Sequence, residues 1–176
     1  MRLNSSRNLG TKTKTYIDTN IYIYAILHHP EYGEICAEIL RDIEKGIFET
    51  YGSDLVALEL LGALSRVDPH IARRAVEDYL SIDMVLLSVN MEVIKLALVI
   101  NEEVNVKYDA VHAALMMLSG IPVVITNDLD DWKKISRNFT KMVNKALEEG
   151  YVISIDKIEV VTPYNYKKWK NNIVVK

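Results

Sequence analysis

The stretch KTYIDTNIYIYAIL, residues 14–27, places one acidic residue, Asp18, between the apolar pair Tyr16 and Ile17 and a second apolar run. This pattern predicts a short apolar strand that ends on the carboxylate and then turns into a helix. An ionised carboxylate that leaves water must be paired, hydrogen-bonded or bound to a metal, because uncompensated burial is costly. Whether Asp18 belongs to a functional site therefore depends on whether other acids end other strands.

Outward from this stretch, strand and helix patterns alternate along the chain. Alternation of this kind implies a parallel sheet that helices cover on both faces. We therefore expect an α/β protein, a three-layer α/β/α sandwich with a central, mostly parallel sheet of four to five strands. The expected strands cover residues 16–18, 47–53, 83–89 and 122–126, and the expected helices cover residues 19–28, 31–45, 54–67, 68–80, 90–103 and 107–120.

Length and composition fit one domain: 176 residues, of which 49% are hydrophobic, suffice for a sizeable core. The single cysteine, Cys36, cannot form an intramolecular disulfide and has the helical spacing of a core residue. The sequence contains neither a signal peptide nor an apolar run long enough to cross a bilayer. We expect a soluble, cytoplasmic protein that does not bind membranes.

Charge is unevenly distributed along the chain. Eight of the 21 basic residues lie in residues 1–15 and 163–176, which hold no acid, so residues 16–162 hold 13 basic against 24 acidic residues, a net charge of −11. An acidic core argues against a broad basic surface for nucleic acid, but not against an acidic metal pocket. We expect a flexible basic tail at 1–15, one domain at 16–163 and a basic C-terminal tail at 164–176.

Four acids stand out by position. Asp18 and Asp128 follow apolar strands, Glu59 is the only charge in LVALELLGAL (55–64), and Asp109 opens the helix DAVHAALMML. Singly, each has an ordinary interpretation, such as an acid favoured in a first helical turn or a solvated helix face. Together they can converge, because sites in open parallel sheets lie outside the carboxyl ends of the strands.

A pocket of four carboxylates has a definite chemistry. Crowded carboxylates repel one another, so at neutral pH they share protons or hold cations. Oxygen ligands without a Cys or His cluster suit Mg²⁺ or Mn²⁺, which serve phosphodiester hydrolysis. We therefore predict Asp18, Glu59, Asp109 and Asp128 as catalytic residues.

The motifs YIDTN around Asp18, LVALELLGAL around Glu59, VKYDAVHAAL around Asp109 and VVITNDLDDW around Asp128 resemble, in order and spacing, the acidic signature of the PIN-domain nucleases. That family includes the VapC toxins of toxin–antitoxin pairs. The resemblance covers about residues 14–136, with IEVVTP (158–163) similar to the family's last strand, and implies a PIN-like fold.

The resemblance also implies roles. In the family these acids hold Mg²⁺ or Mn²⁺ and cut RNA, which implies Asp18, Asp109 and Asp128 as metal ligands with Glu59 completing the shell. Thr126 and Asn20 are similar to polar residues that support the family's site. The implied partners are an RNA substrate, a second copy in a homodimer and a small antitoxin protein.

Two features depart from the family pattern. The family often has a further acid followed by an aromatic residue, and here both Asp130 and Asp131 precede Trp132; we take Asp131 as the supporting residue. Residues 133–157 are extra chain, and their apolar spacing from Trp132 predicts one amphipathic helix of about 20 residues closed by Gly150. Its opposite face is either solvated or an RNA-binding basic stripe, formed by Lys134, Arg137, Lys141 and Lys145.

Other functions remain open from the sequence. DLD at 128–130 offers the Asp-x-Asp of haloacid dehalogenase phosphatases only superficially, because TN separates it from the strand. His112, one turn after Asp109, is interpreted as a packing or supporting residue rather than a ligand. The alternatives to a toxin ribonuclease are a housekeeping RNA-processing nuclease and a non-catalytic PIN-like binding or scaffold module.

Overall fold

The computed structural model describes residues 12–174, and its centre is a five-stranded sheet with the strand order β3-β2-β1-β4-β5. Every neighbouring pair of strands is parallel. This confirms the predicted parallel sheet of four to five strands, and the number is five. The strands are β1 (Lys14–Ile17), β2 (Glu49–Ser53), β3 (Val85–Leu87), β4 (Val123–Ile125) and β5 (Glu159–Val161).

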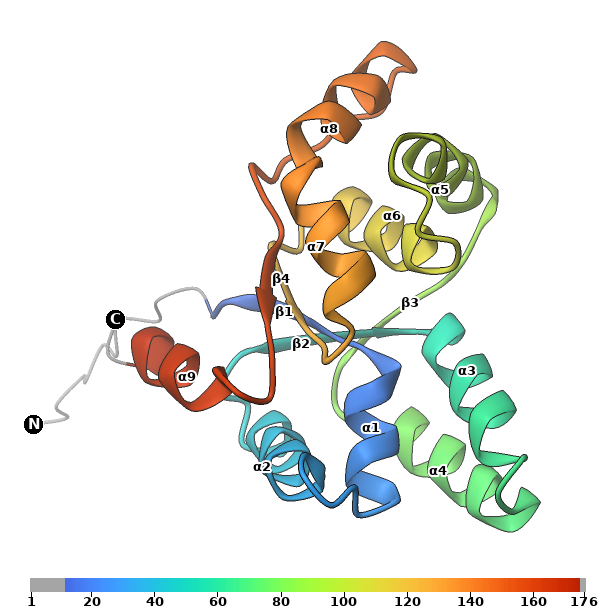
Figure 1. Ribbon diagram of the computed structural model, residues 1–176, viewed down its shortest axis with the longest axis vertical. Coiled ribbons are helices and arrows are strands. Elements are labelled where there is room, and N and C mark those ends of the chain that lie inside the picture. Colours follow the sequence, from blue (N-terminus) through green and yellow to red (C-terminus); the bar gives the residue numbers. More distant parts are fainter. Residues whose placement is uncertain (1–11, 175–176) are drawn as a thin grey trace, which may run out of the picture.

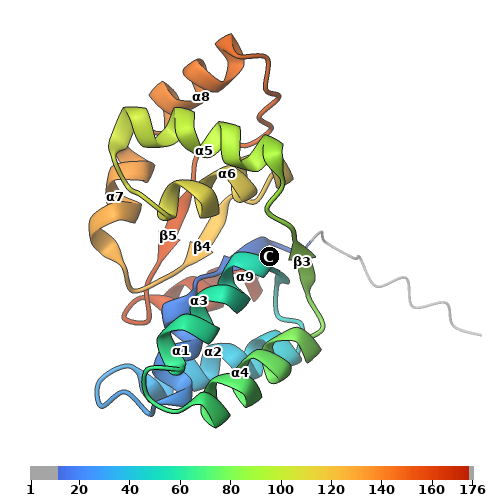
Figure 2. The same ribbon diagram turned by 90° about the vertical axis from the view of Figure 1, so that its right-hand side faces the viewer.

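Helices cover both faces of the sheet, as Figures 1 and 2 show, so the predicted three-layer α/β/α sandwich is confirmed. One layer contains α1 (Thr19–Ile26), α2 (Gly33–Glu44), α3 (Asp54–Leu64), α4 (Pro69–Ser81) and α9 (Tyr166–Val174). The other layer contains α5 (Met91–Val104), α6 (Asp109–Ser119), α7 (Leu129–Arg137) and α8 (Phe139–Glu148).

The central strand β1 explains why the opening stretch is apolar. Tyr16 and Ile17 have no exposed surface, because β1 is flanked by β2 and β4 and covered by helices on both faces. Tyr16 is in register with Tyr51 of β2 and Val124 of β4. Burying such side chains contributes about 1.5–3 kcal/mol each. The sheet therefore fixes where β1 ends.

The carboxyl ends of three central strands meet at one edge of the sheet. Asp18 directly follows β1, and its backbone N–H donates to the carbonyl of Ile125 at the end of β4, at 3.0 Å. Ser53 ends β2 and caps α3 by accepting a bond from the N–H of Val56. Parallel register thus brings the ends of β1, β2 and β4 together.

The predicted single helix after Trp132 is wrong, because Asn138 divides the segment into α7 and α8. The backbone of Asn138 has φ −101° and ψ 12°, outside the α-helical region, and its side-chain amide donates to the carbonyl of Lys134 at 2.8 Å beside the bond from its own backbone N–H at 3.1 Å. The apolar face itself is as predicted: its residues Trp132, Ile135, Phe139, Met142 and Ala146 are all buried.

The C-terminal residues do not form a free basic tail within the described chain. Residues 166–174 form α9, whose Tyr166 and Trp169 are buried. Lys170 pairs with Glu38 and Asp42 of α2, each at 2.7 Å. The lysines that mark the segment as a tail in the sequence therefore include one that anchors a packed helix.

At the N-terminus, the expected tail at 1–15 lies largely outside the described residues, and Lys14 already belongs to β1. No helix in the described part of the chain is both long and apolar enough to span a membrane.

Candidate functional site

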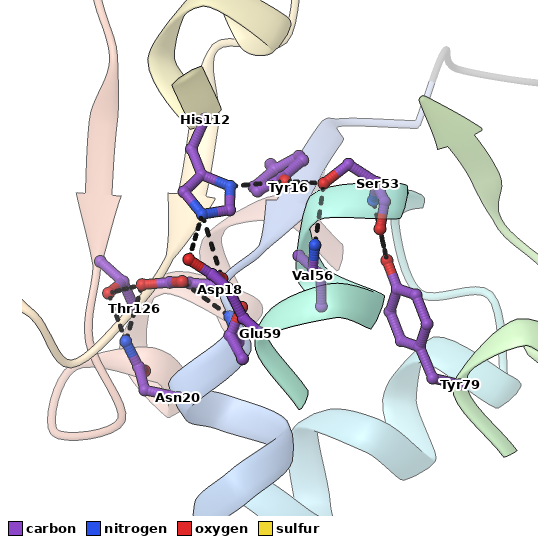
Figure 3. A network of polar contacts seen from close by, with 10 residues as sticks. Tyr16, Asp18, Asn20, Ser53, Val56, Glu59, Tyr79, His112 and Thr126 are labelled. Atoms are coloured by element: carbon purple, nitrogen blue, oxygen red, sulfur yellow. Dashed lines mark hydrogen bonds and ion pairs between the residues drawn. The ribbon is translucent and has the colours of Figure 1, made fainter. Parts of the chain in front are cut away.

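The Asp18 carboxylate is buried and held by three hydrogen bonds. It caps α1 by accepting from the backbone N–H of Thr19 at 2.6 Å. Its other oxygen accepts from the side-chain amide of Asn20 at 2.6 Å and from the hydroxyl of Thr126 at 2.5 Å (Figure 3). These bonds compensate the burial of a charge and fix the direction of the carboxylate.

Thr126 and Asn20 tie the ends of β1 and β4 together. The buried Thr126 hydroxyl donates to Asp18 and accepts from the backbone N–H of Asp128 at 2.9 Å and from Asn20 at 3.0 Å. The side-chain oxygen of Asn20 accepts from the backbone N–H of Asn127 at 2.9 Å. The two supporting residues expected from the sequence therefore lie beside Asp18 and set the position of the Asp128 backbone.

Three further acids gather at the starts of α6 and α7. One carboxylate oxygen from each of Asp109, Asp128 and Asp131 lies within 4.8 Å of the others. Asp109 is the first residue of α6, and Asp128 caps α7 through a bond from the N–H of Asp130. Of the two acids before Trp132, it is thus Asp131 that joins the group, where it also pairs with Lys134 at 2.5 Å.

Glu59 and His112 form a second group with Asp18. One ligand atom from each of these three residues lies within 4.8 Å of the others. His112 Nε2 is 3.2 Å from the Glu59 carboxylate, which also accepts from the Thr19 hydroxyl. His112 Nδ1 lies 2.8 Å from the hydroxyl of Tyr16 (Figure 3). Both ring nitrogens of His112 are therefore engaged with protein atoms.

The pKa values of Asp109 and Asp18 are shifted by burial and by the neighbouring carboxylates. Burial, the Asp18 carboxylate and then Asp128 and Asp131 raise the pKa of Asp109 to about 7, against an opposing effect of His112. Burial also raises the pKa of Asp18, and the bond from Thr126 offsets it only in part. Burial is the largest cause of the pKa shift at Asp109, and the neighbouring carboxylates add to it.

In the Glu59–His112 pair, each pKa is shifted toward the charged form of its group. Burial raises the pKa of Glu59, but the bonds from His112 and Thr19 outweigh it and leave the pKa below its usual value. For His112, burial lowers the pKa, and Glu59 and Asp18 more than restore it. The raised pKa favours the protonated form of His112 beside Glu59.

One open pocket of about 440 Å³ connects the two groups. The four predicted acids, Asp18, Glu59, Asp109 and Asp128, all line it. Arg66, just beyond the end of α3, is the only cation among the lining residues, which all belong to the described chain. The structure thus brings together every acid that the sequence singled out, although they are spread over 111 residues from position 18 to position 128.

The pocket suits a divalent cation. Its acids offer oxygen ligands, the donor type that Mg²⁺ and Mn²⁺ prefer. A cation bound there would favour the ionised form of Asp109, which burial and the neighbouring carboxylates disfavour. We call the space lined by these acids the acidic pocket.

His112 is a site residue that the sequence pattern ranked as a packing or supporting group. Its helical spacing of three from Asp109 is the signal that places both on one face of α6. That His112 would meet Glu59 depends on how α3 and α6 pack across the sheet, which spacing along one helix does not contain.

The four residues of the predicted basic stripe lie on two successive helices. Lys134 and Arg137 lie on α7, and Lys141 and Lys145 lie on α8. Lys134 is paired with Asp131, and Lys141 is paired with Glu103 of α5. Two of the four charges are thus already neutralised by neighbouring acids.

Comparison with known proteins gives a family and a fold. The family model of the PIN domain matches residues 15–138. The chain is similar to a chain in the crystal structure of VapBC2 from Rickettsia felis bound to a DNA fragment from their promoter, with 15% identity, a TM-score of 0.55, and coverage of 85% of this chain and 98% of that chain.

A second similar structure is DNA-bound VapBC from Salmonella typhimurium, with 20% identity, a TM-score of 0.56, and coverage of 86% of this chain and 98% of that chain. At these identities the likeness shows the fold alone. The comparison with curated proteins gave no match.

Proposed function

This chain belongs to the PIN-domain family, and with that membership as the premise we propose that it is an endoribonuclease that hydrolyses RNA phosphodiester bonds with Mg²⁺ or Mn²⁺. The observation that carries the proposal is the acidic pocket, in which four carboxylates from distant parts of the chain line one open space. A bound divalent ion supplies Lewis-acid chemistry there, lowering the pKa of a water and neutralising charge on the phosphate.

The chain's own residues have separate tasks in this proposal. Asp18, Asp109 and Asp128 hold the ion, and Glu59 completes its surroundings. The bonds from Thr126 and Asn20 hold the Asp18 carboxylate in one orientation, so little reorganisation is needed when a cation binds. His112 and Thr19 orient Glu59 in the same way.

The test is cleavage of a fluorescent single-stranded RNA during titration with Mg²⁺ or Mn²⁺. The wild-type protein should cleave it, and Asp18→Asn and Asp128→Asn should lose the activity while they stay folded, because each removes one ligand charge and relieves repulsion. Asp68→Asn, at the half-buried N-cap of α4, is the matched control and should cleave as wild type. Metal-dependent cleavage that survives Asp18→Asn would sink the assignment, and a wild-type protein inert with both metals would favour a binding module.

We further propose that the protein is a toxin with an antitoxin partner, since the matched solved structures are VapBC complexes. Expression in a bacterial host should then arrest growth, and Asp18→Asn should relieve the arrest. Co-expression of a small DNA-binding protein encoded beside this gene should relieve it too. Growth that is unaffected by an active enzyme would instead favour a housekeeping RNA-processing nuclease.

A further inference from the structure

Two more depressions continue from the acidic pocket along α7. The first, of about 400 Å³, shares Asn20 and Asp128 with the acidic pocket and is also lined by Tyr24 and Leu129. The second, of about 600 Å³, shares Leu129 with the first and runs between α7 and the edge strand β5. Because neighbouring depressions share lining residues, the three adjoin one another, and we call them together the surface path.

Tyr24 lines the first depression, and its ring packs against those of His29 and Tyr32. We call these three residues the aromatic cluster. The ring centroids of Tyr24 and Tyr32 lie 5.8 Å apart with an interplanar angle of 27°, and those of His29 and Tyr32 lie 5.2 Å apart at 20°. His29 Nδ1 accepts from the backbone N–H groups of Glu31 and Tyr32, each at 3.2 Å. The tight turn between α1 and α2 therefore holds the rings in a fixed stack.

The second depression, which we call the basic groove, carries three cations: Lys133, Arg137 and Lys157. Its one acid is Glu159. The groove is a built feature, because the hydroxyl of Ser136 on α7 donates to the carbonyl of Ile158 before β5, at 3.0 Å. That bond fixes the two walls relative to each other.

The charges of the basic groove are available to a ligand. Within residues 12–174, the ion pairs recorded for lysines of this region are those of Lys134 and Lys141, and neither Lys133 nor Lys157 takes part in one. A surplus of positive charge beside an acidic pocket, on a chain of net charge −3, is a local reversal of sign. Such a reversal suits a ligand with a repeated negative charge.

We propose that single-stranded RNA lies along this path, with a base stacked on the aromatic cluster and backbone phosphates bound by Lys133, Arg137 and Lys157. Aromatic faces that stack bases beside a cationic groove that follows the backbone are the two elements that single-strand binding requires. Arg137 lies nine residues after Asp128, about 13 Å along α7, so the groove binds the strand beyond the scissile phosphate. The proposal rests on the proposed ribonuclease function but concerns binding, which is measured separately from cleavage.

The basic groove is tested by fluorescence anisotropy with a labelled single-stranded RNA, with Ca²⁺ in place of Mg²⁺ to hold off cleavage. Lys133→Glu combined with Lys157→Glu should lower the affinity at least about tenfold and reduce the salt slope by about 1.4, since each phosphate contact contributes about 0.7. The matched control is Arg74→Glu combined with Lys168→Glu, the same change of charge at exposed positions of α4 and α9, which should shift the affinity less than about twofold. Equal affinities and slopes for the two double variants would overturn the groove.

The aromatic cluster is tested by two substitutions at Tyr24. Tyr24→Phe keeps the ring and should bind RNA as wild type, whereas Tyr24→Leu keeps apolar bulk without a stacking face and should weaken binding about tenfold. Because both variants retain a large side chain, a difference between them reports stacking rather than misfolding. Equal binding by the two variants would overturn the stacking role.

Failure of the path and failure of the nuclease are distinguishable. If the wild type cleaves RNA and the groove variant both binds and cleaves as wild type, the path is wrong and the nuclease stands. If no metal supports cleavage but binding falls in the groove variant and not in its control, the path stands and the nuclease is wrong.

Discussion

At the scale of single residues, the hydroxyl of Thr126, just after β4, connects several residues of the candidate site. This hydroxyl is the one group that contacts Asp18, Asn20 and the backbone of Asp128 at once. The hydroxyl both donates and accepts hydrogen bonds, whereas an ionised carboxylate only accepts them and an ammonium group only donates them. The residue therefore couples the position of Asp18 to that of Asp128.

We predict that Thr126→Val destabilises the protein by about 1–3 kcal/mol and lowers cleavage, because the isosteric side chain leaves Asp18 and the N–H of Asp128 short of a partner. Thr126→Ser should restore most of both properties. Thermal unfolding and metal-dependent cleavage, measured on the same preparations, check the prediction. A Thr126→Val protein as stable and active as the wild type would show that the hydroxyl is dispensable.

Asp109 gives the site a predicted pH dependence. Its folded pKa of about 7 exceeds its ordinary value of 3.8, so the folded state binds the proton more tightly than the unfolded state does. The stability from this proton is fully present below pH 3.8 and is lost as the pH rises through about 7. The metal-free protein should therefore become less stable between pH 5 and pH 8.

Each pKa unit corresponds to about 1.4 kcal/mol, so the loss should exceed about 1 kcal/mol, or roughly 2–4 °C in Tm for a chain of this size. Thermal unfolding in EDTA across this pH range measures it, with Asp109→Asn as the variant that should flatten the profile. Added Mg²⁺ should restore the stability at pH 8. A profile of Asp109→Asn identical to that of the wild type would contradict the assignment to this carboxyl.

At the scale of elements, the basic C-terminal segment that the sequence predicts as a tail contains the packed helix α9. Trp169 packs against Phe48 with ring centroids 5.7 Å apart, and the hydroxyl of Tyr166 donates to the buried Asp42 at 2.9 Å. Lys170 adds two ion pairs to α2. The helix α9 is therefore part of the sandwich. The contacts of Tyr166, Trp169 and Lys170 hold the chain after β5 against α2 and Phe48.

We predict that Trp169→Ala costs about 3–5 kcal/mol, the usual range for removing a buried large aromatic side chain. Lys168→Ala, at an exposed position of the same helix, should change the stability by less than about 0.5 kcal/mol. Chemical unfolding of both variants gives the comparison. Similar stabilities would mean that α9 contributes little to the fold.

Element by element, local patterns succeeded where one buried face decided the outcome. The strand–helix alternation and the apolar face from Trp132 to Ala146 were predictable, because burial imposes periodicity. The break at Asn138 was not predictable, because it depends on the backbone conformation of that one residue, which apolar periodicity does not encode. The docking of α9 depends on Asp42 and Phe48, which are more than a hundred residues earlier in the chain.

The candidate site was predictable where it depends on the ends of elements, and not where it depends on which helices are neighbours. Asp18, Asp109 and Asp128 lie at element ends, which a parallel sheet places at one edge whatever the details of packing. The contact between His112 and Glu59, and the basic groove between Lys133 and Lys157, depend on which helices become neighbours. Three-dimensional proximity of this kind is not encoded in spacing along one element.

At the scale of the whole molecule, one side of the domain carries an unusual amount of exposed apolar surface. On α5, Met91, Ile94 and Leu98 follow helical spacing and have exposed fractions of 66%, 42% and 62%. The edge strand β3, which leads into α5, adds Val85 and Leu86 (Figure 2). Exposed apolar side chains gathered on one helix face are typical of an interaction surface, and we call those of α5 the apolar patch.

We therefore expect a homodimer in which this patch faces its symmetry-related copy, since isologous pairing lets one apolar patch cover another. Light scattering on the wild type at micromolar concentration should give twice the chain mass of 20.1 kDa. Met91→Asp combined with Leu98→Asp should give a folded monomer, because both side chains are largely exposed and contribute little to the domain's own core. Leu147→Asp, at an exposed position of α8 outside the patch, is the control and should remain dimeric. A wild-type monomer would refute the dimer, and a double variant that remains dimeric would place the interface on another face.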